Sequence, residues 1–243
     1  MGYYHPLSKR PYHILARPGD VAEKVVVSGD PQRVEKASRL LDNPRIVNKH
    51  RGFLTITGEY NGVRVTLATH GIGAPSAAIV FEELFMLGAR EIIRAGTCGA
   101  LRREAAAGTI VIIEASAYTP GGTLGSYFPG VSFPAYATPE LVLSLERAAK
   151  RLGVKYLRGV ALSHDAFHVV EKRAPEWGSL GIDVLEMESA TLFALGRYRG
   201  FKTGALALVV DNMASGEELT EQREELELRM VQIALEALTS GTQ

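Results

Sequence analysis

The sequence has little cysteine, no excess charge of either sign and no long apolar run. Its single cysteine, Cys98, excludes an intrachain disulfide framework and favours a reducing compartment. Lys plus Arg and Asp plus Glu both total 27, which leaves no broad positive surface for nucleic acid or an anionic membrane. The six histidines lack metal-ligand spacing, and no apolar run reaches the ~18 residues of a membrane span. We therefore expect a cytoplasmic protein with no metal, no nucleic-acid partner and no membrane contact.

The composition is that of an ordinary globular domain. The chain has 243 residues, of which 46% are hydrophobic and 22% are charged. This length is sufficient for one large core. Because no repeat, low-complexity segment or linker divides the chain, residues 1–243 are predicted to form a single domain.

Short apolar runs alternate with helical patterns along the chain. Strands are predicted at Lys24–Ser28, Phe53–Tyr60, Val63–Thr69, Glu91–Ala95, Thr109–Ala117, Tyr156–Leu162, Asp183–Leu185 and Thr203–Val210. Helices are predicted at Pro31–Leu41, Pro75–Leu87, Pro139–Leu152, Glu188–Tyr198 and Glu217–Leu238. Asn61-Gly62 is a strong hairpin signal between two of the strands. The pattern predicts an α/β fold with a central mixed β-sheet flanked by helices.

One segment does not fit the alternation. Tyr118–Ala137 carries four Gly, three Pro, three Tyr and two Phe. A loop of about 20 residues inside a compact domain usually has a function or lies at an interface. We expect one of these two roles for it.

Two carboxylates flank a methionine in Glu186-Met187-Glu188, where a short apolar run passes into a helical pattern. An isolated buried carboxylate is costly unless something pairs with it. A sugar has hydroxyls to donate and an apolar face to cover, so it suits this arrangement. The alternative is a helix start, where Glu favours the positive end of the helix dipole. Both interpretations stay open on these residues alone.

Two stretches have the composition of an anion site. In Ser28-Gly29-Asp30-Pro31 a strand ends at a glycine and a helix starts, and backbone N–H groups at such a start favour an anion. Arg33 is placed to reach the same anion, although a plain turn with a surface arginine is the alternative. Arg94 closes an apolar strand and needs an anionic partner, while Thr97 adds a hydroxyl nearby. That partner is either a phosphate or a core carboxylate.

Other motif-like residues carry weaker signals. Gly71 and Gly73 resemble the start of a dinucleotide fingerprint, but Ser76 occupies its third glycine position. We discount an NAD site and expect these glycines to allow a close approach of the backbone. Asp211 ends an apolar strand, either as an active-site carboxylate at the sheet edge or as an Asx turn or N-cap. Cys98 lacks surroundings that lower a thiol pKa, so we expect a small buried residue.

Taken in order, these stretches resemble the nucleoside phosphorylase family: hexameric purine nucleoside phosphorylase, methylthioadenosine phosphorylase and uridine phosphorylase. The matching stretches are Ser28-Gly29-Asp30-Pro31-x-Arg33, His50-Arg51-Gly52, Thr69-His70-Gly71-Ile72-Gly73-x-Pro75-Ser76, Arg94-x-Gly96-Thr97-Cys98-Gly99-Ala100, Glu186-Met187-Glu188-Ser189-Ala190-Thr191-Leu192 and Asp211-Asn212. Each is weak alone, but together and in this order they are highly specific. The resemblance implies a three-layer phosphorylase fold.

The resemblance also implies roles by position for the phosphate and the ribose. Glu188 would hold the ribose 2′- and 3′-hydroxyls, Met187 would line the sugar and Glu186 would lie beside it. His13 would reach a neighbouring subunit's ribose, with His5 as the rival assignment. The phosphate-binding residues would be Gly29, Arg33, Arg94 and Thr97, with Arg51 contributed by a neighbouring subunit.

For the base, the resemblance implies that Phe167 stacks on the ring. Asp211 resembles the acid that protonates a purine leaving group, and Arg223 best fits the arginine that assists it. Uridine phosphorylases read the uracil edge with a Gln-x-Arg pair. Here Glu171 replaces the glutamine, although Arg173 stands at the right offset as a base-binding residue. A purine preference is therefore expected, and uridine phosphorylase is the alternative.

The implied reaction is phosphorolysis, in which a nucleoside and inorganic phosphate give a free base and ribose 1-phosphate. It needs no cofactor, since phosphate is the co-substrate. Two alternatives are a nucleoside hydrolase of the same fold and a nucleoside-binding module without catalysis. The three arginines at positions 33, 51 and 94 argue against the hydrolase. Sites shared between subunits imply a homo-oligomer, at least a dimer and by resemblance a hexamer built as a trimer of dimers.

Overall fold

A mixed sheet of ten strands organises residues 10–240, the part of the chain that this computed structural model describes. The strands are β1 (Lys24–Ser28), β2 (Asp42–Asn48), β3 (Thr55–Tyr60), β4 (Val63–Thr69), β5 (Glu91–Ala100), β6 (Ile110–Tyr118), β7 (Tyr156–Ser163), β8 (Val184–Glu186), β9 (Lys202–Asn212) and β10 (Glu217–Glu218). The α-helices are α1 (Pro31–Ala37), α2 (Ala74–Met86), α3 (Gly122–Tyr127), α4 (Pro139–Arg151), α5 (Ala174–Ser179), α6 (Ser189–Arg199) and α7 (Arg223–Thr239). Short 3₁₀ helices lie at η2 (Ser38–Leu40), η3 (His50–Gly52) and η4 (Phe167–Lys172).

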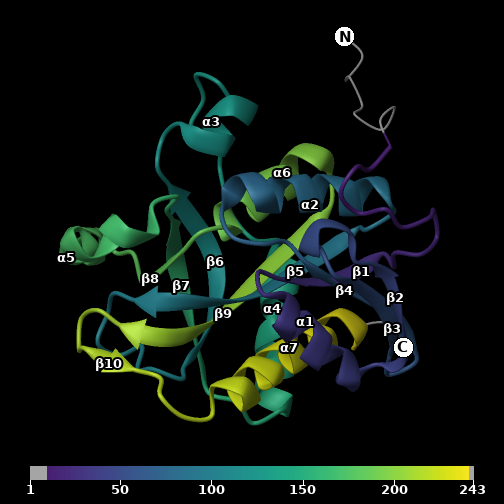
Figure 1. The fold of residues 1–243 in the computed structure, drawn as a ribbon. Helices are drawn as coiled ribbons and strands as arrows, with labels where there is room; N and C mark the ends of the chain where they lie inside the picture. The colour runs from purple at the N-terminus through teal and green to yellow at the C-terminus, as the bar shows by residue number, and fades with distance from the viewer. Residues whose placement is uncertain (1–9, 241–243) are drawn as a thin grey trace.

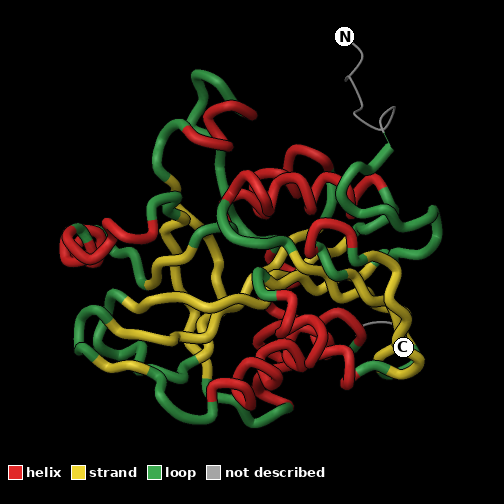
Figure 2. Tube along the Cα trace, in the orientation of Figure 1, coloured by secondary structure: helices red, strands yellow, loops and turns green. Residues whose placement is uncertain are grey.

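The helices cover both faces of the sheet. In Figure 1, α2 and α6 lie above the strands, whereas α1, α4 and α7 lie below them. The tube in Figure 2 shows the same three layers, with strands between two helical layers. The predicted mixed α/β fold with a central sheet is therefore confirmed.

Two long strands make the sheet fold back on itself. The strand order is β10-β9-β6-β7-β8-β5-β1-β4-β3-β2, and β9 also pairs with β5. β5 pairs with β1 through its first half and with β8 through its last two residues. Because β5 also pairs with β9, a ring is closed by strands β5, β9, β6, β7 and β8. The sequence does not predict this closure, which brings the ends of β5, β8 and β9 together.

Several predicted elements match the observed bounds. β1 and β4 begin and end at the predicted residues. Asn61 and Gly62 both have positive φ, 52° and 73°, and join antiparallel β3 and β4. A turn with two positive φ values suits the right-handed twist of a hairpin. α4 matches its prediction to one residue, although Thr138 does not cap it through its side chain.

Other predictions were wrong. The strand containing Arg94 does not close there, because β5 continues to Ala100 along β9. The last helix begins at Arg223, whereas Glu217–Glu218 pairs with the end of β9 as β10. β2 was not predicted at all, since most of Asp42–Asn48 is exposed and lacks alternating apolar residues.

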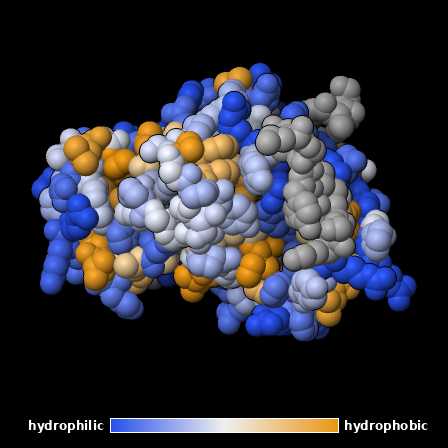
Figure 3. Space-filling view, turned by 90° about the horizontal axis from the view of Figure 1, so that it is seen from above, coloured by the Kyte–Doolittle hydropathy of each residue, from blue (hydrophilic) through white to orange (hydrophobic). Residues whose placement is uncertain are grey.

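The core lies on both faces of the sheet. Its largest fully buried side chains include Phe81, Phe193 and Leu145. On the face seen in Figure 3, hydrophobic side chains form small separate clusters among hydrophilic ones outside the grey atoms. Within residues 10–240, no helix is both long and apolar enough to cross a membrane.

Candidate active site

Parallel strand pairing brings the ends of β1 and β4 beside the middle of β5. Ser28 is in register with Thr69, and Val27 with Arg94. Ligands of α/β sheets bind where carboxyl ends of strands meet, because the following turns expose backbone groups there. A side chain at Gly29 would collide with the carbonyl of Gly71, 2.9 Å from the added Cβ. The glycine-rich turns after β1 and β4 therefore touch each other.

Arg94 is the cation at the centre of this region. Its guanidinium is buried and forms a hydrogen-bonded ion pair with Glu188. Its Nη1 lies 3.4 Å from Glu186, but neither Nη1 nor Nε has a hydrogen-bond partner among the described residues. Burial lowers the pKa of Arg94, but Glu188 and Glu186 more than offset this and raise it. The guanidinium is thus fully charged, with two donors to spare.

Glu188 links the glycine-rich turn to Arg94. One carboxylate oxygen accepts from the backbone N–H of Gly73 at 2.6 Å, and the other accepts from Arg94. Gly73 has a φ of +84°, a backbone conformation that residues with a side chain rarely adopt. The predicted close approach of the backbone is therefore to Glu188 at Gly73 and to Gly29 at Gly71.

Glu186 has a different role from Glu188. Its Oε2 accepts from the backbone N–H groups of Glu188 and Ser189 at 2.9 and 2.8 Å. Its Oε1 accepts from the hydroxyls of Ser163 and Ser189. These donors saturate the carboxylate. Glu186 therefore holds the start of α6 in place, while half-buried Met187 lies between the two buried carboxylates.

Arg33 and His70 border the same region. The Arg33 side chain is only 5% exposed and pairs with Glu227 of α7 at 2.9 Å, while its buried Nε lacks a partner among residues 10–240. His70 is completely buried, with its Cε1 3.5 Å from where a Cβ on Gly29 would lie. Burial and the positive charge of Arg94 keep the pKa of His70 well below its ordinary value, so the imidazole is neutral.

Asp211 lies near the C-terminal end of β9, where β9 pairs with the last residues of β5 in the closed ring of strands. Its carboxylate packs against Gly99 of β5, 3.0 Å from where a Cβ would lie. Burial raises its pKa, and repulsion from Glu218 and Glu171 raises it further. Asp211 is the last residue but one of β9 rather than the cap of a helix, so the N-cap alternative is not observed. Thr97 lies half-buried on β5 between Arg94 and Gly99. Cys98 is buried, as predicted, and burial raises the pKa of its thiol.

Asp211 forms no ion pair with Arg223, which was expected to assist it, and Arg173, which was expected to bind the base, is paired elsewhere. Arg223 donates from Nε to Glu227 at 3.0 Å and is 55% exposed. Arg173 pairs with Glu176 at 3.2 Å and lies over the Trp177 ring. Phe167 begins η4 and is 67% exposed. These three residues therefore form their observed contacts outside the buried centre of the site.

His13 and Arg51 occupy a separate patch at the edge of the site. His13 donates from Nδ1 to the Glu83 carboxylate of α2 at 2.8 Å and packs edge-on against Phe53. Arg51 is exposed and has φ of 55° in the turn just before Phe53. Phe53 also lies 3.8 Å from where a Cβ on Gly71 would lie, which joins this patch to the glycine-rich turns. His5, the rival to His13, lies outside the described residues.

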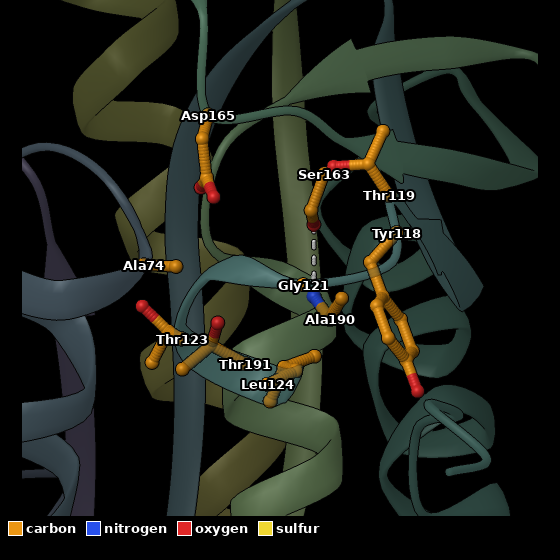
Figure 4. A pocket seen from close by; sticks show the side chains of 10 residues that line it. All are labelled: Ala74, Tyr118, Thr119, Gly121, Thr123, Leu124, Ser163, Asp165, Ala190 and Thr191. Carbon is orange, nitrogen blue, oxygen red and sulfur yellow. Dashed lines mark hydrogen bonds between the residues drawn. The ribbon is translucent and has the colours of Figure 1, made fainter. Parts of the chain in front are cut away.

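The predicted long loop contributes to a pocket next to Glu186. Tyr118–Ala137 contains α3, and the rings of Phe128 and Phe133 stack at 3.9 Å within it. Figure 4 shows Ser163 and Asp165 facing this pocket, with Ser163 bonded to the backbone of Ala190. The other residues that line the pocket are Ala74, Tyr118, Thr119, Gly121, Thr123, Leu124 and Thr191. The loop therefore lines a pocket that also contains Ser163, a hydrogen-bond partner of Glu186.

Sequence reasoning missed the carboxylates that bind Arg33 and His13. Glu227 is 194 residues from Arg33, and Glu83 is 70 residues from His13. No local pattern marks either glutamate, because each sits on an ordinary amphipathic helix. Ser189 and Gly73, by contrast, lie inside the stretches that match the family, so the sequence did indicate that they belong to the site.

Comparison with known proteins gives a consistent result. The model of the phosphorylase superfamily matches residues 23–239. A uridine phosphorylase from Thermococcus kodakarensis is 37% identical over 85% of this chain and 79% of its own length. A guanosine phosphorylase from Halorubrum lacusprofundi is 32% identical over 96% of this chain and 100% of its own. The solved purine nucleoside phosphorylase from Toxoplasma gondii, in complex with immucillin-H, superposes with a TM-score of 0.86 at 28% identity and covers 99% of this chain and 98% of its own.

Proposed function

Because this chain belongs to the phosphorylase superfamily, we propose that it is a nucleoside phosphorylase acting on purine ribonucleosides. The reaction transfers the ribosyl group from the base to inorganic phosphate and yields free base and ribose 1-phosphate. Relatives that act on guanosine, on purine nucleosides and on uridine support the reaction class.

The observation that carries this proposal is the contact between Arg94 and Glu188. Arg94 has unpartnered donors for a phosphate oxygen, and Glu188 can exchange its bond to Arg94 for bonds to ribose hydroxyls. A phosphate and a sugar bound to these two side chains would touch each other. Such placement lowers the entropic part of the barrier to attack on C1′. Gly29, Arg33 and Thr97 would complete the phosphate site around Arg94.

In the proposed mechanism a phosphate oxygen forms a bond to C1′ while the glycosidic bond breaks. Positive charge develops on the sugar in the transition state, and the phosphate and Glu188 stabilise it. The bonding pair leaves with the base. A protonated Asp211 donates a proton to purine N7, and the raised pKa of Asp211 favours the protonated form. Phosphate itself is the nucleophile, so the reaction requires no metal or organic cofactor.

Uridine phosphorylase is the second candidate, and the resemblance to the Thermococcus enzyme favours it. The residues at the two positions that read the uracil edge in uridine phosphorylases, Glu171 and Arg173, argue for purines instead. Arg173 is engaged by Glu176 and Trp177, and Glu171 stands where uridine enzymes have glutamine. An acid at Asp211 has a partner in purine N7, whereas uracil has no equivalent ring nitrogen. Phe167 would stack on either base.

A nucleoside panel incubated with and without phosphate tests the proposal. We expect base release from guanosine, inosine or adenosine only when phosphate is present. Release without phosphate would indicate a hydrolase, and no release from any nucleoside would indicate a binding module. Release from uridine alone would replace the purine assignment with the second candidate.

We also propose a cytoplasmic homo-oligomer with sites shared between subunits, at least a dimer and in full a hexamer built as a trimer of dimers. His13 and Arg51 would serve a neighbouring site. The exposed side chains of Tyr12, Leu15 and Ile72, beside these two residues, support a contact surface there. A two-fold contact through this patch would place each His13 and Arg51 next to the partner's glycine-rich turns.

A further inference from the structure

Glu227 is the only described carboxylate that forms an ion pair with Arg33. Its Oε1 accepts from Arg33 Nη2 at 2.9 Å and from Arg223 Nε at 3.0 Å. The Glu227 side chain is 14% exposed and that of Arg33 is 5% exposed. Burial raises the pKa of Glu227, but the two arginines outweigh this effect and lower it. Glu227 is therefore an ionised carboxylate at the junction of α1 and α7.

Arg33 depends on such a partner. A guanidinium on a long side chain has many rotamers, and fixing it costs conformational entropy. A buried cation without a hydrogen-bonded anion is strongly disfavoured. Glu227 supplies that anion and leaves the buried Nε of Arg33 without any partner among residues 10–240. One donor is thus anchored while another stays available for an incoming anion.

Arg33 lies near the other predicted phosphate ligands. The positive charges of Arg94 and Arg33 both lower the pKa of His70, which lies against Gly29, so the two cations lie near the same turn. Glu227 reaches Arg33 from α7, on the helical layer below the sheet (Figure 1). Because Glu227 binds Nη2, the unpartnered Nε of Arg33 stays available to an anion.

We infer that Glu227 is a positioning residue for phosphate: it fixes Arg33 so that its free donor binds the phosphate oxygen. This inference rests on the proposed function and adds a residue outside every stretch that carries the family resemblance. Glu227 acts through Arg33 and does not touch the substrate. Its removal therefore weakens phosphate binding selectively.

Two variants and one matched control test the inference in the full-length protein. Glu227→Ala removes the acceptor, and Glu227→Gln keeps an acceptor oxygen without the charge. Glu224→Gln is the control, since Glu224 lies on the same helix and pairs with exposed Lys36 at 2.6 Å. The KM for phosphate, the KM for nucleoside and kcat are measured for each. Calorimetric titration with inorganic phosphate, without nucleoside, gives a second readout, and thermal melting reports folding.

For Glu227→Ala we expect the KM and the Kd for phosphate to rise about tenfold or more, because one charged hydrogen bond to Arg33 is lost. The nucleoside KM, and kcat at saturating phosphate, should stay near wild type. Glu227→Gln should recover part of the loss and provides the readout if Glu227→Ala does not fold. Glu224→Gln should match wild type.

Three results would overturn the inference. An unchanged phosphate constant in Glu227→Gln and Glu227→Ala would show that Arg33 needs no anchor. A lower KM or Kd for phosphate in these variants would show that Glu227 competes with phosphate for Arg33. An equal rise in both substrate constants would indicate a general structural role. If wild type cleaves nucleosides without phosphate, the proposed function fails first, and calorimetry still reports whether Glu227 affects phosphate binding.

Discussion

Asp211, the proposed acid for the purine leaving group, would give turnover a pH dependence. Burial and two neighbouring carboxylates raise its pKa, which favours a neutral acid at the end of β9. The protonated form donates the proton, so purine turnover should be constant below this pKa and decline as pH rises through it. Asp211→Asn should lower kcat/KM for purine nucleosides by about 10²–10⁴, the usual contribution of general acid catalysis.

Profiles of kcat/KM against pH for wild type and Asp211→Asn check this prediction. The decline at high pH should disappear in the variant. A variant with wild-type rates, or a rate that rises as Asp211 loses its proton, would exclude it as the acid.

For the buried His70 we expect an effect of pH on the free energy of unfolding rather than on turnover. The folded protein keeps this imidazole neutral, whereas the unfolded chain titrates near the ordinary pKa of ~6.5. Below that pH the unfolded state binds the additional proton, so the free energy of unfolding falls as pH falls. The slope reaches at most about 1.4 kcal/mol per pH unit from this one group.

Denaturant unfolding at several pH values, at one protein concentration, measures the slope. His70→Leu removes the titrating group and should flatten the dependence between pH 7 and pH 5, a window just above and below the unfolded pKa of ~6.5. An identical slope in the variant would mean that other groups cause the loss.

At the scale of elements, β5 carries more of the site than its sequence indicates. Gly96-Thr97-Cys98-Gly99 has the composition of a loop, yet it continues β5 in register with β9. Tertiary pairing outweighs local propensity here. Gly96 also has a steric role, because a Cβ at this position would collide with the Arg94 guanidinium.

Gly96→Ala should therefore displace Arg94 and weaken phosphate binding, with the sheet intact because its backbone φ is ordinary. Phosphate titration by calorimetry, together with circular dichroism, measures both effects. Gly125→Ala is the matched control, since nothing lies within 4 Å of an added Cβ there. Unchanged phosphate affinity in Gly96→Ala would contradict the assigned role of Arg94.

The sequence predicts those features that are determined by residues close together in the chain. β1, β4 and the Asn61-Gly62 turn follow from apolar runs and turn chemistry within a few residues. The ring closed by β5 depends on its pairings with β8 and β9, which are distant segments of the chain. The motif residues Arg94 and Glu188 could be named in advance, but not that they contact each other.

The unequal roles of two neighbouring carboxylates are a similar case. Glu186 and Glu188 are two residues apart, and only the family resemblance, not the local pattern, implied different roles for them. Only the positions of Ser163 and Gly73, from other elements, make one carboxylate saturated and the other available. Glu227 carried no sequence signal because its partner lies on α1, at the opposite end of the chain.

At the scale of the whole molecule, the central claim about assembly is that His13 and Arg51 act in a neighbour's site. Their patch borders the glycine-rich turns but is bonded to α2 rather than to Glu188. A mixture of two inactive variants can distinguish shared from separate sites. Arg51→Ala and Glu188→Ala should each be nearly inactive alone.

Co-expression of these two variants should restore activity, because a mixed dimer contains one site with an intact Glu188 and an intact Arg51 from its partner. Activity of the co-purified mixture is compared with each variant alone and with wild type. If Arg51 served its own subunit, every site would lack one residue and no activity would return.

The most direct test of the account is the chemical identity of the sugar product. ³¹P NMR of the protein with a purine nucleoside and inorganic phosphate should show the phosphate signal replaced by that of ribose 1-phosphate as free base accumulates. The same mixture without phosphate should leave the nucleoside intact. Free ribose as the product, or base release that does not consume phosphate, would contradict the account.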